Sequence, residues 1–402
     1  MDITIHPSKL SGDITIIPSK SQAHRLLICA AFADAPTDLI CPETNRDIEA
    51  TARCLSLICH CIARTDYGYD ITPYGYMDTP FDAYWLNCHE SGSTLRFLLP
   101  IVGALGADTI FKMEGRLSQR PLSPLWEEME RMGCSIKWLN DSELKVTGKL
   151  RPGDYYIDGG VSSQFITGLL FATSLLDGDS TIHIRGKLES APYVEMTRKA
   201  MAQFGVDTTD FHVRGGQVYH SPGKLAVEGD WSGGAFFLAA DYLGSDVNIY
   251  GLDLNSPQGD RAVSDILPQL REGNITISAA DIPDLVPVLA VAAAHFHGAV
   301  FKDIRRLRLK ESDRVATTIA MIEALGGKAE ADENTLTVSG TGLTGGTVDA
   351  ANDHRIAMAA AIAATACREP VTIHGAECVS KSYPRFWEEF ARLGGSYEQY
   401  LR

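Results

Sequence analysis

Cationic and hydroxyl side chains recur in short polar segments of this chain, each placed directly before an apolar stretch. Lys20 and Ser21 stand in one such segment, and Arg314 and Arg355 stand in two others. Guanidinium groups bind phosphates and carboxylates through paired hydrogen bonds, and serine hydroxyls complete a phosphate shell. A single segment of this kind is more often a capped, solvated loop than a binding site. Recurrence at equivalent places instead predicts a site for small anionic molecules.

The polar segments belong to a repeat that accounts for the whole chain. Each repeat has a short strand, a polar turn and a small-residue apolar helix, and the six copies begin at Gly12, Phe81, Gly153, Gly223, Asn274 and Gly345. Corresponding turn residues are about 70 residues apart, with one shorter step. The first copy has its turn at 18–22 and its helix at 26–32. Amphipathic helices and alternating strands lie between the copies, which predicts six βαβαββ units.

The two series of helices differ in composition. Those of the first series are apolar on all sides, as in 356–364, and we expect them to be buried. Those of the second, such as 121–132, carry a polar face and should cover the outside. The sequence therefore predicts an α/β fold with two pseudo-symmetric domains of three units each, helices inside and sheets outside. We expect an N-terminal domain at 14–226 and a C-terminal domain at 1–13 plus 227–402, so that the chain crosses between them twice.

The start of each buried helix is the expected place for chemistry. A helix N-terminus offers free N–H groups and about half a positive charge. If three such ends from each domain faced one cleft, that cleft would bind anions before any side chain is counted. The six polar turns thus predict an anion site shared by both halves.

Bulk properties narrow the class of protein. A net charge of −15 disfavours nucleic acid and membrane surfaces as partners, although a local basic cluster remains compatible with an anionic substrate. Nine scattered cysteines and an N-terminus without targeting features predict a cytoplasmic protein with reduced thiols. The group of Cys54, Cys59, His60 and Cys61 lacks the spacing of a zinc site, so we expect no metal.

Several motifs resemble those of the enolpyruvyl transferase family, and specifically of the 5-enolpyruvylshikimate-3-phosphate synthases. The resemblance extends in order from residue 14 to residue 384 and rests on segments 18–25, 119–121, 160–165, 309–314, 352–358 and 378–381. It implies two domains of three βαβαββ units with an interdomain cleft that closes on substrate. It also implies transfer of the enolpyruvyl group of phosphoenolpyruvate to the 5-hydroxyl of shikimate 3-phosphate, with release of phosphate and without a cofactor. The protein would be a monomer.

The resemblance also assigns binding residues. Those implied for shikimate 3-phosphate are Lys20, Ser21, Arg25, Ser162, Ser163, Ser190, Asp284 and Lys310. Those implied for phosphoenolpyruvate are Lys20, Gly92, Arg120, Gln164, Arg314, Arg355 and Lys381, with His354 in a supporting place.

The reaction needs a proton on the methylene carbon while the hydroxyl attacks the neighbouring carbon, and the resulting tetrahedral ketal then loses phosphate and a methyl proton. Our hypothesis is that Asp284 takes the hydroxyl proton and that Lys20 and Glu311 handle the methylene proton. A competing interpretation makes Asp284 only the cap of the helix after Pro283.

Two departures from the family pattern and two rival functions stay open. Glu90 stands where relatives usually have Asn, and Arg306 where they often have Asn. UDP-N-acetylglucosamine enolpyruvyl transferase shares the expected fold and donor, but it uses a Cys in a loop that corresponds to 114–120 here, where this chain has none. A non-catalytic scaffold that binds polyanions is the second rival, and it should be basic overall.

Overall fold

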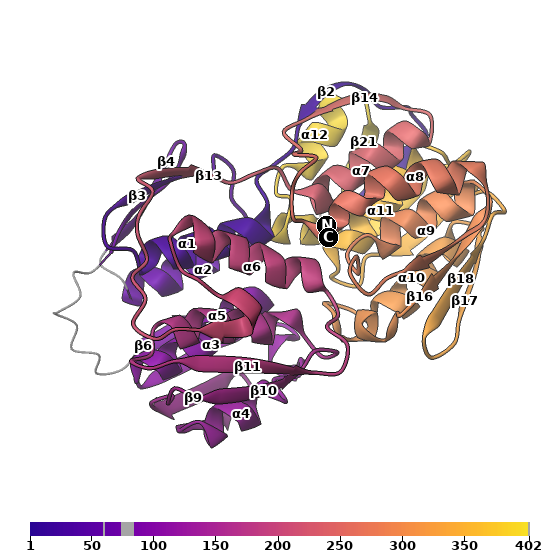
Figure 1. Ribbon diagram of the computed structural model, residues 1–402. Coiled ribbons are helices and arrows are strands. Elements are labelled where there is room, and N and C mark those ends of the chain that lie inside the picture. Colours follow the sequence, from indigo (N-terminus) through magenta and orange to yellow (C-terminus); the bar gives the residue numbers. More distant parts are fainter. Residues whose placement is uncertain (59–60, 74–83, 401–402) are drawn as a thin grey trace. The chain divides into compact units, whose positions relative to one another are not determined.

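The computed structural model describes residues 1–58, 61–73 and 84–400. Cys59, His60 and the first residues of the second repeat, 81–83, lie outside them. The chain forms two compact units: a terminal unit of Met1–Ser19 and Glu228–Arg402, and an inserted unit of Lys20–Val227. Both ends of the chain belong to the terminal unit (Figure 1).

The inserted unit contains three sheets, in the part of the chain that is described. The first has the order β13-β3-β5-β4 and the second the order β6-β7-β9-β8, while the third is β10-β11-β12. The strands are β3 (Thr37–Ile40), β4 (Cys61–Thr65), β5 (Gly68–Thr72), β6 (Tyr84–Asn87), β7 (Thr109–Lys112), β8 (Cys134–Asn140), β9 (Glu143–Gly148), β10 (Asp154–Asp158), β11 (Ser180–Arg185), β12 (His212–Val213) and β13 (Lys224–Ala226). The helices are α1 (Lys20–Ala31), α2 (Arg46–Ile58), α3 (Gly92–Leu105), α4 (Leu125–Arg131), α5 (Ser163–Ser174) and α6 (Ala191–Gln203).

The terminal unit repeats this plan. Its sheets have the orders β15-β16-β18-β17, β19-β20-β1-β21 and β14-β2. The strands are β1 (Asp2–His6), β2 (Ser11–Thr15), β14 (Asp246–Tyr250), β15 (Ile275–Ser278), β16 (Gly298–Lys302), β17 (Lys328–Ala331), β18 (Thr335–Ser339), β19 (Gly346–Asp349), β20 (Val371–His374) and β21 (Ser396–Tyr400). The helices are α7 (Trp231–Tyr242), α8 (Val263–Glu272), α9 (Val286–His295), α10 (Arg314–Ala324), α11 (His354–Ala364) and α12 (Phe386–Arg392).

The first series of helices forms the core of each unit. Every residue of α11 is buried, as is α9 from Val286 to Ala294, and these two helices pack on each other. In the inserted unit α3 packs on α5 in the same way (Figure 1). By contrast, α4 buries only one side, through Leu125, Glu128 and Met129. The prediction of apolar helices inside and amphipathic helices outside is confirmed.

Side-chain caps fix where several core helices begin. Ser91 accepts a hydrogen bond from the N–H of Thr94 at the start of α3, and Ser162 caps α5. Asp230 and Asp353 cap α7 and α11 in the same manner. Such caps satisfy one or two of the N–H groups that a helix start leaves without a partner in the helix. The α1 helix differs from the prediction because it begins at Lys20, so that Lys20 and Ser21 lie in its first turn instead of in a loop before it.

The repeat is less regular than predicted in two units. Four of the sheets formed by described residues have four strands in equivalent orders, but the third and fourth repeats contribute a sheet of three strands and a sheet of two. The α/β class with two similar halves is confirmed. The prediction that every repeat keeps the full βαβαββ pattern is not confirmed, because periodicity in the sequence does not require each copy to keep its outer strands.

Two strands are exchanged between the units. In the β6-β7-β9-β8 sheet, the first strand of the repeat runs parallel to β7. The equivalent place beside β3 is taken by β13, and the equivalent place beside β14 is taken by β2. The strand before α1 thus belongs to the terminal unit, and the strand before α7 belongs to the inserted unit. The predicted start of the N-terminal domain at residue 14 is therefore wrong: residues 14–19 lie in the terminal unit, and the other crossing follows Val227.

Two helical glycines provide a test of core packing. A Cβ on Gly168 of α5 would lie 2.3 Å from the carbonyl oxygen of Arg96 and 3.0 Å from Cγ of Pro100, both in α3. We expect Gly168→Ala to destabilise the protein by about 1–3 kcal/mol, because overpacking outweighs a helix preference of up to about 1 kcal/mol for Ala. Urea denaturation measures this difference.

Gly233 of α7 is the matched control. A Cβ there would meet its nearest atoms, in the Tyr383 ring, at an ordinary 3.6 Å. Gly233→Ala should leave stability unchanged or raise it by up to about 1 kcal/mol. Equal urea midpoints for the two variants would contradict the close approach of α5 to α3.

Candidate active site

Arg314 is the centre of the polar cluster in the terminal unit. Its side chain is 1% exposed, and its Nη1 donates to Oδ1 of Asp284 at 2.7 Å. Its Nη2 donates to Oε2 of Glu311 at 2.6 Å, and its Nε donates to Oδ2 of Asp353 at 3.0 Å. Burial by itself lowers the pKa of Arg314, but the carboxylates of Asp353, Glu311 and Asp284 raise it on balance. A charge buried this far is retained because three carboxylates surround it.

Asp284 gathers three cations. Besides Arg314, Nη2 of Arg355 donates to Oδ2 of Asp284 at 3.2 Å, and Nζ of Lys310 lies 3.6 Å from Oδ1. The following helix, α9, begins at Val286 after Leu285 and has no side-chain cap. The cap position of α9 is thus occupied by Leu285 and not by Asp284. Its carboxylate lies among cations contributed by α10, α11 and the segment before α10.

The two lysines of this cluster, Lys310 and Lys381, lie in different surroundings. Desolvation lowers the pKa of Lys310 to about 8, while Asp284 raises it and Arg314 lowers it further. Lys381 is buried at the end of the 3₁₀ helix Ala376–Lys381, and its Nζ donates to the carbonyl oxygen of Asn352 at 3.0 Å. Lys381 thus lies beside the start of α11, where Asp353, the buried His354 and Arg355 follow Asn352 in the chain.

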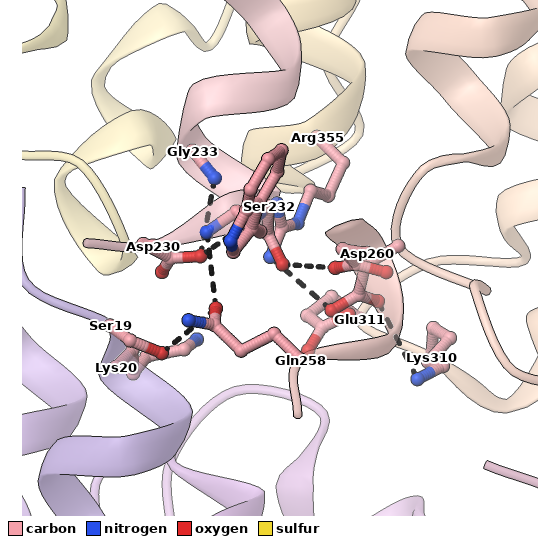
Figure 2. A network of polar contacts seen from close by, with 12 residues as sticks. Ser19, Lys20, Asp230, Ser232, Gly233, Gln258, Asp260, Lys310, Glu311 and Arg355 are labelled. Atoms are coloured by element: carbon pink, nitrogen blue, oxygen red, sulfur yellow. Dashed lines mark hydrogen bonds and ion pairs between the residues drawn. The ribbon is translucent and has the colours of Figure 1, made fainter. Parts of the chain in front are cut away.

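A second carboxyl group, that of Asp260, lies at the start of α7, near enough to Asp284 to be affected by its charge. Ser232 donates its hydroxyl to Oδ2 of Asp260, while Asp230 caps the N–H groups of Ser232 and Gly233 (Figure 2). Burial, followed by the charge of Asp284, raises the pKa of Asp260 to about 7, against the opposing effect of Arg355. The Asp230–Gly234 turn carries no cation, and its Ser232 holds the buried Asp260 of the 3₁₀ helix Gly259–Ala262.

In the inserted unit, α1 presents the first group of predicted residues. Nζ of Lys20 donates to Oδ2 of Asp47 in α2 at 2.9 Å. Arg25 is buried and donates to Oγ1 of Thr197 at 2.8 Å, to the carbonyl oxygen of Tyr193 at 2.9 Å and to that of Ser21 at 2.6 Å. Burial lowers the pKa of Arg25 to about 10. Arg25 therefore fastens α1 to α6 and holds the backbone of Ser21.

The start of α3 forms the second group. A Cβ on Gly92 would lie 2.8 Å from Nη1 of Arg120 and 2.8 Å from Nη1 of Arg96, so a side chain at this position would displace the ends of both guanidinium groups from the turn. Nη1 of Arg96 donates to Oε1 of Gln164 at 2.9 Å, and Nε2 of Gln164 donates to Oγ of Ser93 at 3.0 Å. The N-termini of α3 and α5 are thereby joined beside two arginines.

The predicted serines lie at helix starts. Ser162 is the cap of α5 and accepts from the N–H of Gln164, and the buried Ser163 is its first residue. Ser190 precedes α6 with a φ of 56°, without a side-chain cap bond. Glu90, the departure from the family pattern, turns toward Gly115: a Cβ there would lie 2.1 Å from its Oε1. Its carboxylate thus approaches the loop that carries Arg120.

The predicted site residues therefore fall into two half-sites, each within one unit. The terminal half-site contains Asp284, Lys310, Glu311, Arg314, His354, Arg355 and Lys381. The inserted half-site contains Lys20, Ser21, Arg25, Gly92, Arg120, Ser162, Ser163, Gln164 and Ser190. The first combines carboxylates with cations, as proton transfer requires, and the second combines cations, hydroxyls and helix N-termini, as anion binding requires.

Sequence reasoning missed the partners that hold these residues. Asp353 was not singled out, although it stands directly before His354 and Arg355 in a helix-cap position. Asp47 and Asp260 were taken only as starts of outer helices, and each instead directs its carboxyl group to a half-site. An acidic first turn has a sufficient explanation in the helix dipole, so these roles had no distinct signal in the sequence.

Within residues 1–58, 61–73 and 84–400, no helix is long and apolar enough to cross a bilayer. Those same residues contain no group of three or more His, Cys, Asp or Glu side chains arranged to hold a metal ion.

Comparisons with known proteins agree with one another. The family model "EPSP synthase (3-phosphoshikimate 1-carboxyvinyltransferase)" matches residues 5–390. The 3-phosphoshikimate 1-carboxyvinyltransferase of Clostridium kluyveri is 38% identical over 99% of this chain and 98% of its own length. That of Clostridium beijerinckii is 37% identical over 99% of both.

Solved structures share the fold. An EPSP synthase from Acinetobacter baumannii superimposes with a TM-score of 0.80 at 23% identity, covering 99% of both chains. The enolpyruvyl transferase NikO from Streptomyces tendae gives 0.74 at 17% identity, covering 99% of this chain and 98% of its own.

Replacing Asp353 tests whether its carboxylate compensates the buried charge of Arg314. Asp353→Asn keeps an acceptor for the N–H of Arg355 but removes a charge from the buried guanidinium. We expect it to cost about 3–5 kcal/mol in the free energy of unfolding. Urea denaturation provides the measurement.

Asp313→Asn is the matched control. Asp313 caps α10 in the same way, and its ion pair with Arg308, at 3.4 Å, is exposed. Its loss should cost less than about 1 kcal/mol. Small and equal losses in both variants would mean that Arg314 does not depend on Asp353.

Proposed function

Since the chain belongs to the EPSP synthase (3-phosphoshikimate 1-carboxyvinyltransferase) family, we propose that its two half-sites carry out that reaction together. The enzyme transfers the enolpyruvyl group of phosphoenolpyruvate to the 5-hydroxyl of shikimate 3-phosphate and releases phosphate, a step of aromatic amino-acid biosynthesis. The observation that supports this proposal most directly is the contact of Asp284 with Arg314, Arg355 and Lys310. A phosphate-release assay with shikimate 3-phosphate and phosphoenolpyruvate tests the proposal. The same assay with UDP-N-acetylglucosamine in place of shikimate 3-phosphate tests the rival UDP-N-acetylglucosamine enolpyruvyl transferase activity.

The terminal half-site, together with Lys20 of the inserted half-site, is proposed to move the protons. Asp284 takes the proton of the attacking hydroxyl, and Lys310 lies close enough to hold a ring hydroxyl beside it. Glu311, oriented by Nη2 of Arg314, and Lys20 handle the proton that is added to the methylene carbon and later removed from the methyl group. The tetrahedral ketal forms between these two events and breaks down when phosphate leaves.

The cations are proposed to bind the two anionic substrates. Phosphoenolpyruvate is bound by Lys20, Gly92, Arg120, Gln164, Arg314, Arg355 and Lys381, with His354 in support. Shikimate 3-phosphate is bound by Lys20, Ser21, Arg25, Ser162, Ser163, Ser190, Asp284 and Lys310. Arg25 acts here through the carbonyl of Ser21, to which it donates. The N-termini of α3 and α5 add N–H groups that favour anions.

Residues from both half-sites are assigned to each substrate. We therefore propose that binding of both substrates brings the two sets to the same pair of molecules. Small-angle scattering with and without shikimate 3-phosphate and phosphoenolpyruvate should show a more compact particle with ligands, and unchanged profiles would argue against this step. We also propose a cytoplasmic monomer that needs no cofactor, and the mass from light scattering tests the monomer.

Asp284→Ala should lower kcat by about 100-fold or more, because general base catalysis contributes about 10²–10⁴-fold. Steady-state phosphate release measures the effect. The control is Asp265→Ala, since Asp265 is exposed on α8 and should leave kcat unchanged. A loss below tenfold for Asp284→Ala would remove it as the base.

Lys310 should shape the alkaline side of the pH profile. With its pKa lowered to about 8 by desolvation, its charge is present below that pH and is lost above it. We expect kcat/KM for shikimate 3-phosphate to fall as the pH rises through about 8. In Lys310→Arg this fall should move to higher pH, because a guanidinium stays charged. An unshifted fall in that variant would assign it to another group.

A further inference from the structure

A line of buried hydrogen bonds connects α1, α2 and α3 in the inserted unit. Nδ1 of His24 lies 2.7 Å from Oγ1 of Thr51, which lies 2.7 Å from Oγ1 of Thr94. Thr94 in turn donates its hydroxyl to Oγ of Ser91 at 2.7 Å. All four side chains have an exposure of 0%. None of them is assigned to a substrate above.

Counting protons gives the line a direction. The single hydroxyl proton of Thr94 goes to Ser91, so Thr94 must accept from Thr51. The hydroxyl proton of Thr51 is then used as well, so Thr51 must accept from Nδ1 of His24. His24 is therefore the source of the line, with its proton on Nδ1.

The surroundings of His24 hold the ring in this state. Desolvation, with smaller effects from Lys20 and Arg25, lowers the pKa of His24 well below its ordinary value. The ring packs edge-on against Phe97 of α3, with centroids 6.3 Å apart, and Arg25 lies over the same Phe97 ring at 5.0 Å. The imidazole is thus a neutral donor fixed between α1 and α3.

The line ends at the turn that precedes α3. Ser91 caps this helix by accepting from the N–H of Thr94, and the next residue, Gly92, meets the guanidinium groups of Arg96 and Arg120. A hydroxyl that receives two hydrogen bonds has little freedom to rotate. The orientation of Ser91, and with it the position of the Gly92 backbone, therefore depends on a donor two helices away.

We propose that His24 is a positioning residue for phosphoenolpyruvate: through Thr51 and Thr94 it sets the Ser91 cap and thereby the Gly92 turn. The inference rests on the proposed function of Gly92. His24 touches no reacting atom and acts on the affinity for one substrate. A histidine that merely fills the core would affect stability and both substrates alike.

Thr51→Val tests the line at its middle, because it exchanges a hydroxyl for a methyl group of similar size. We expect KM for phosphoenolpyruvate to rise about tenfold, as for a lost buried hydrogen bond, with kcat and KM for shikimate 3-phosphate within about twofold. Thr51→Ser restores the hydroxyl and should restore KM. Thr173→Val is the control, since its hydroxyl is equally buried and bonds only within α5, to the carbonyl of Leu169 at 2.8 Å.

Substitution of His24 completes the test. His24→Asn keeps an N–H near the position of Nδ1 and should stay within about threefold of the wild-type KM for phosphoenolpyruvate, whereas His24→Leu should resemble Thr51→Val. His24→Leu combined with Thr51→Val should be no worse than either alone, because both break one line. Nitrogen NMR should find the His24 proton on Nδ1, and a proton on Nε2 would overturn the direction.

Outcomes separate the two proposals. If the wild type releases phosphate and Thr51→Val leaves KM for phosphoenolpyruvate unchanged, or raises KM for both substrates equally, the positioning role is wrong and the reaction stands. If the wild type releases no phosphate, the proposed function fails. The line is then judged by the rise in melting temperature with inorganic phosphate, which should be smaller for Thr51→Val than for Thr173→Val. An equal rise would overturn it.

Discussion

The burial of Arg314 is the constraint on which the terminal half-site depends. A guanidinium that is 1% exposed must have its charge compensated and its N–H groups bonded within the protein. Asp284, Glu311 and Asp353 do this from three different segments, and each becomes oriented as a result. Asp353 also caps α11, so the same residue that neutralises Arg314 places the helix start that carries Arg355. The proposed base and the proposed proton carrier therefore share one anchor, which ties the geometry of the chemistry to the stability of the unit.

Hydrogen bonds also hold the two segments at which the chain crosses between the units. The backbone N–H of Ser19 donates to the carbonyl of Glu228 at 2.7 Å, and that of Asp230 donates to the carbonyl of Ile17 at 2.8 Å. Gln258 lies beside them: its Oε1 accepts from Ser19 at 3.1 Å (Figure 2), and its Nε2 donates to Glu228 at 2.9 Å. Both crossing segments are thereby fixed to the terminal unit up to the residue before Lys20. The exchange of β2 and β13 accounts for these positions. Each of the two strands pairs with a strand outside its own repeat, and the chain crosses to the other unit shortly after it.

A sequence repeat shows which helices and turns recur but not which strands pair, and this explains how much of the structure could be predicted. Periodicity and composition identified the six buried helices and the turns before them, and the family motifs identified residues that the structure gathers into two half-sites. Strand partners were beyond the periodicity, because β2 and β13 have the same pattern as the strands they replace. The start of α1 was placed too late, since the polar run from Lys20 to Arg25 resembles a turn although it faces helix neighbours. Asp47, Asp260 and Asp353 were missed because each has an ordinary local explanation as an acid at a helix start.

The buried arginines of the two half-sites are held by different kinds of acceptor, and this difference matters for a protein that is acidic overall and is proposed to bind two anions. In the terminal unit the arginines contact carboxylates, so their charge is largely compensated and serves to orient Asp284 and Glu311. In the inserted unit Arg25 donates to two hydroxyls and two carbonyls, and Arg96 donates to the amide oxygen of Gln164 and the carbonyl of Pro121. Neutral acceptors hold a guanidinium in place without cancelling its charge, and in a partly buried site that charge acts over a longer range than in water. Arg25 therefore keeps its positive charge within the inserted unit, although the chain as a whole has a net charge of −15. Lys20 is the exception in the inserted unit because it contacts the carboxylate of Asp47, and it is also the residue proposed to serve both substrate binding and proton transfer.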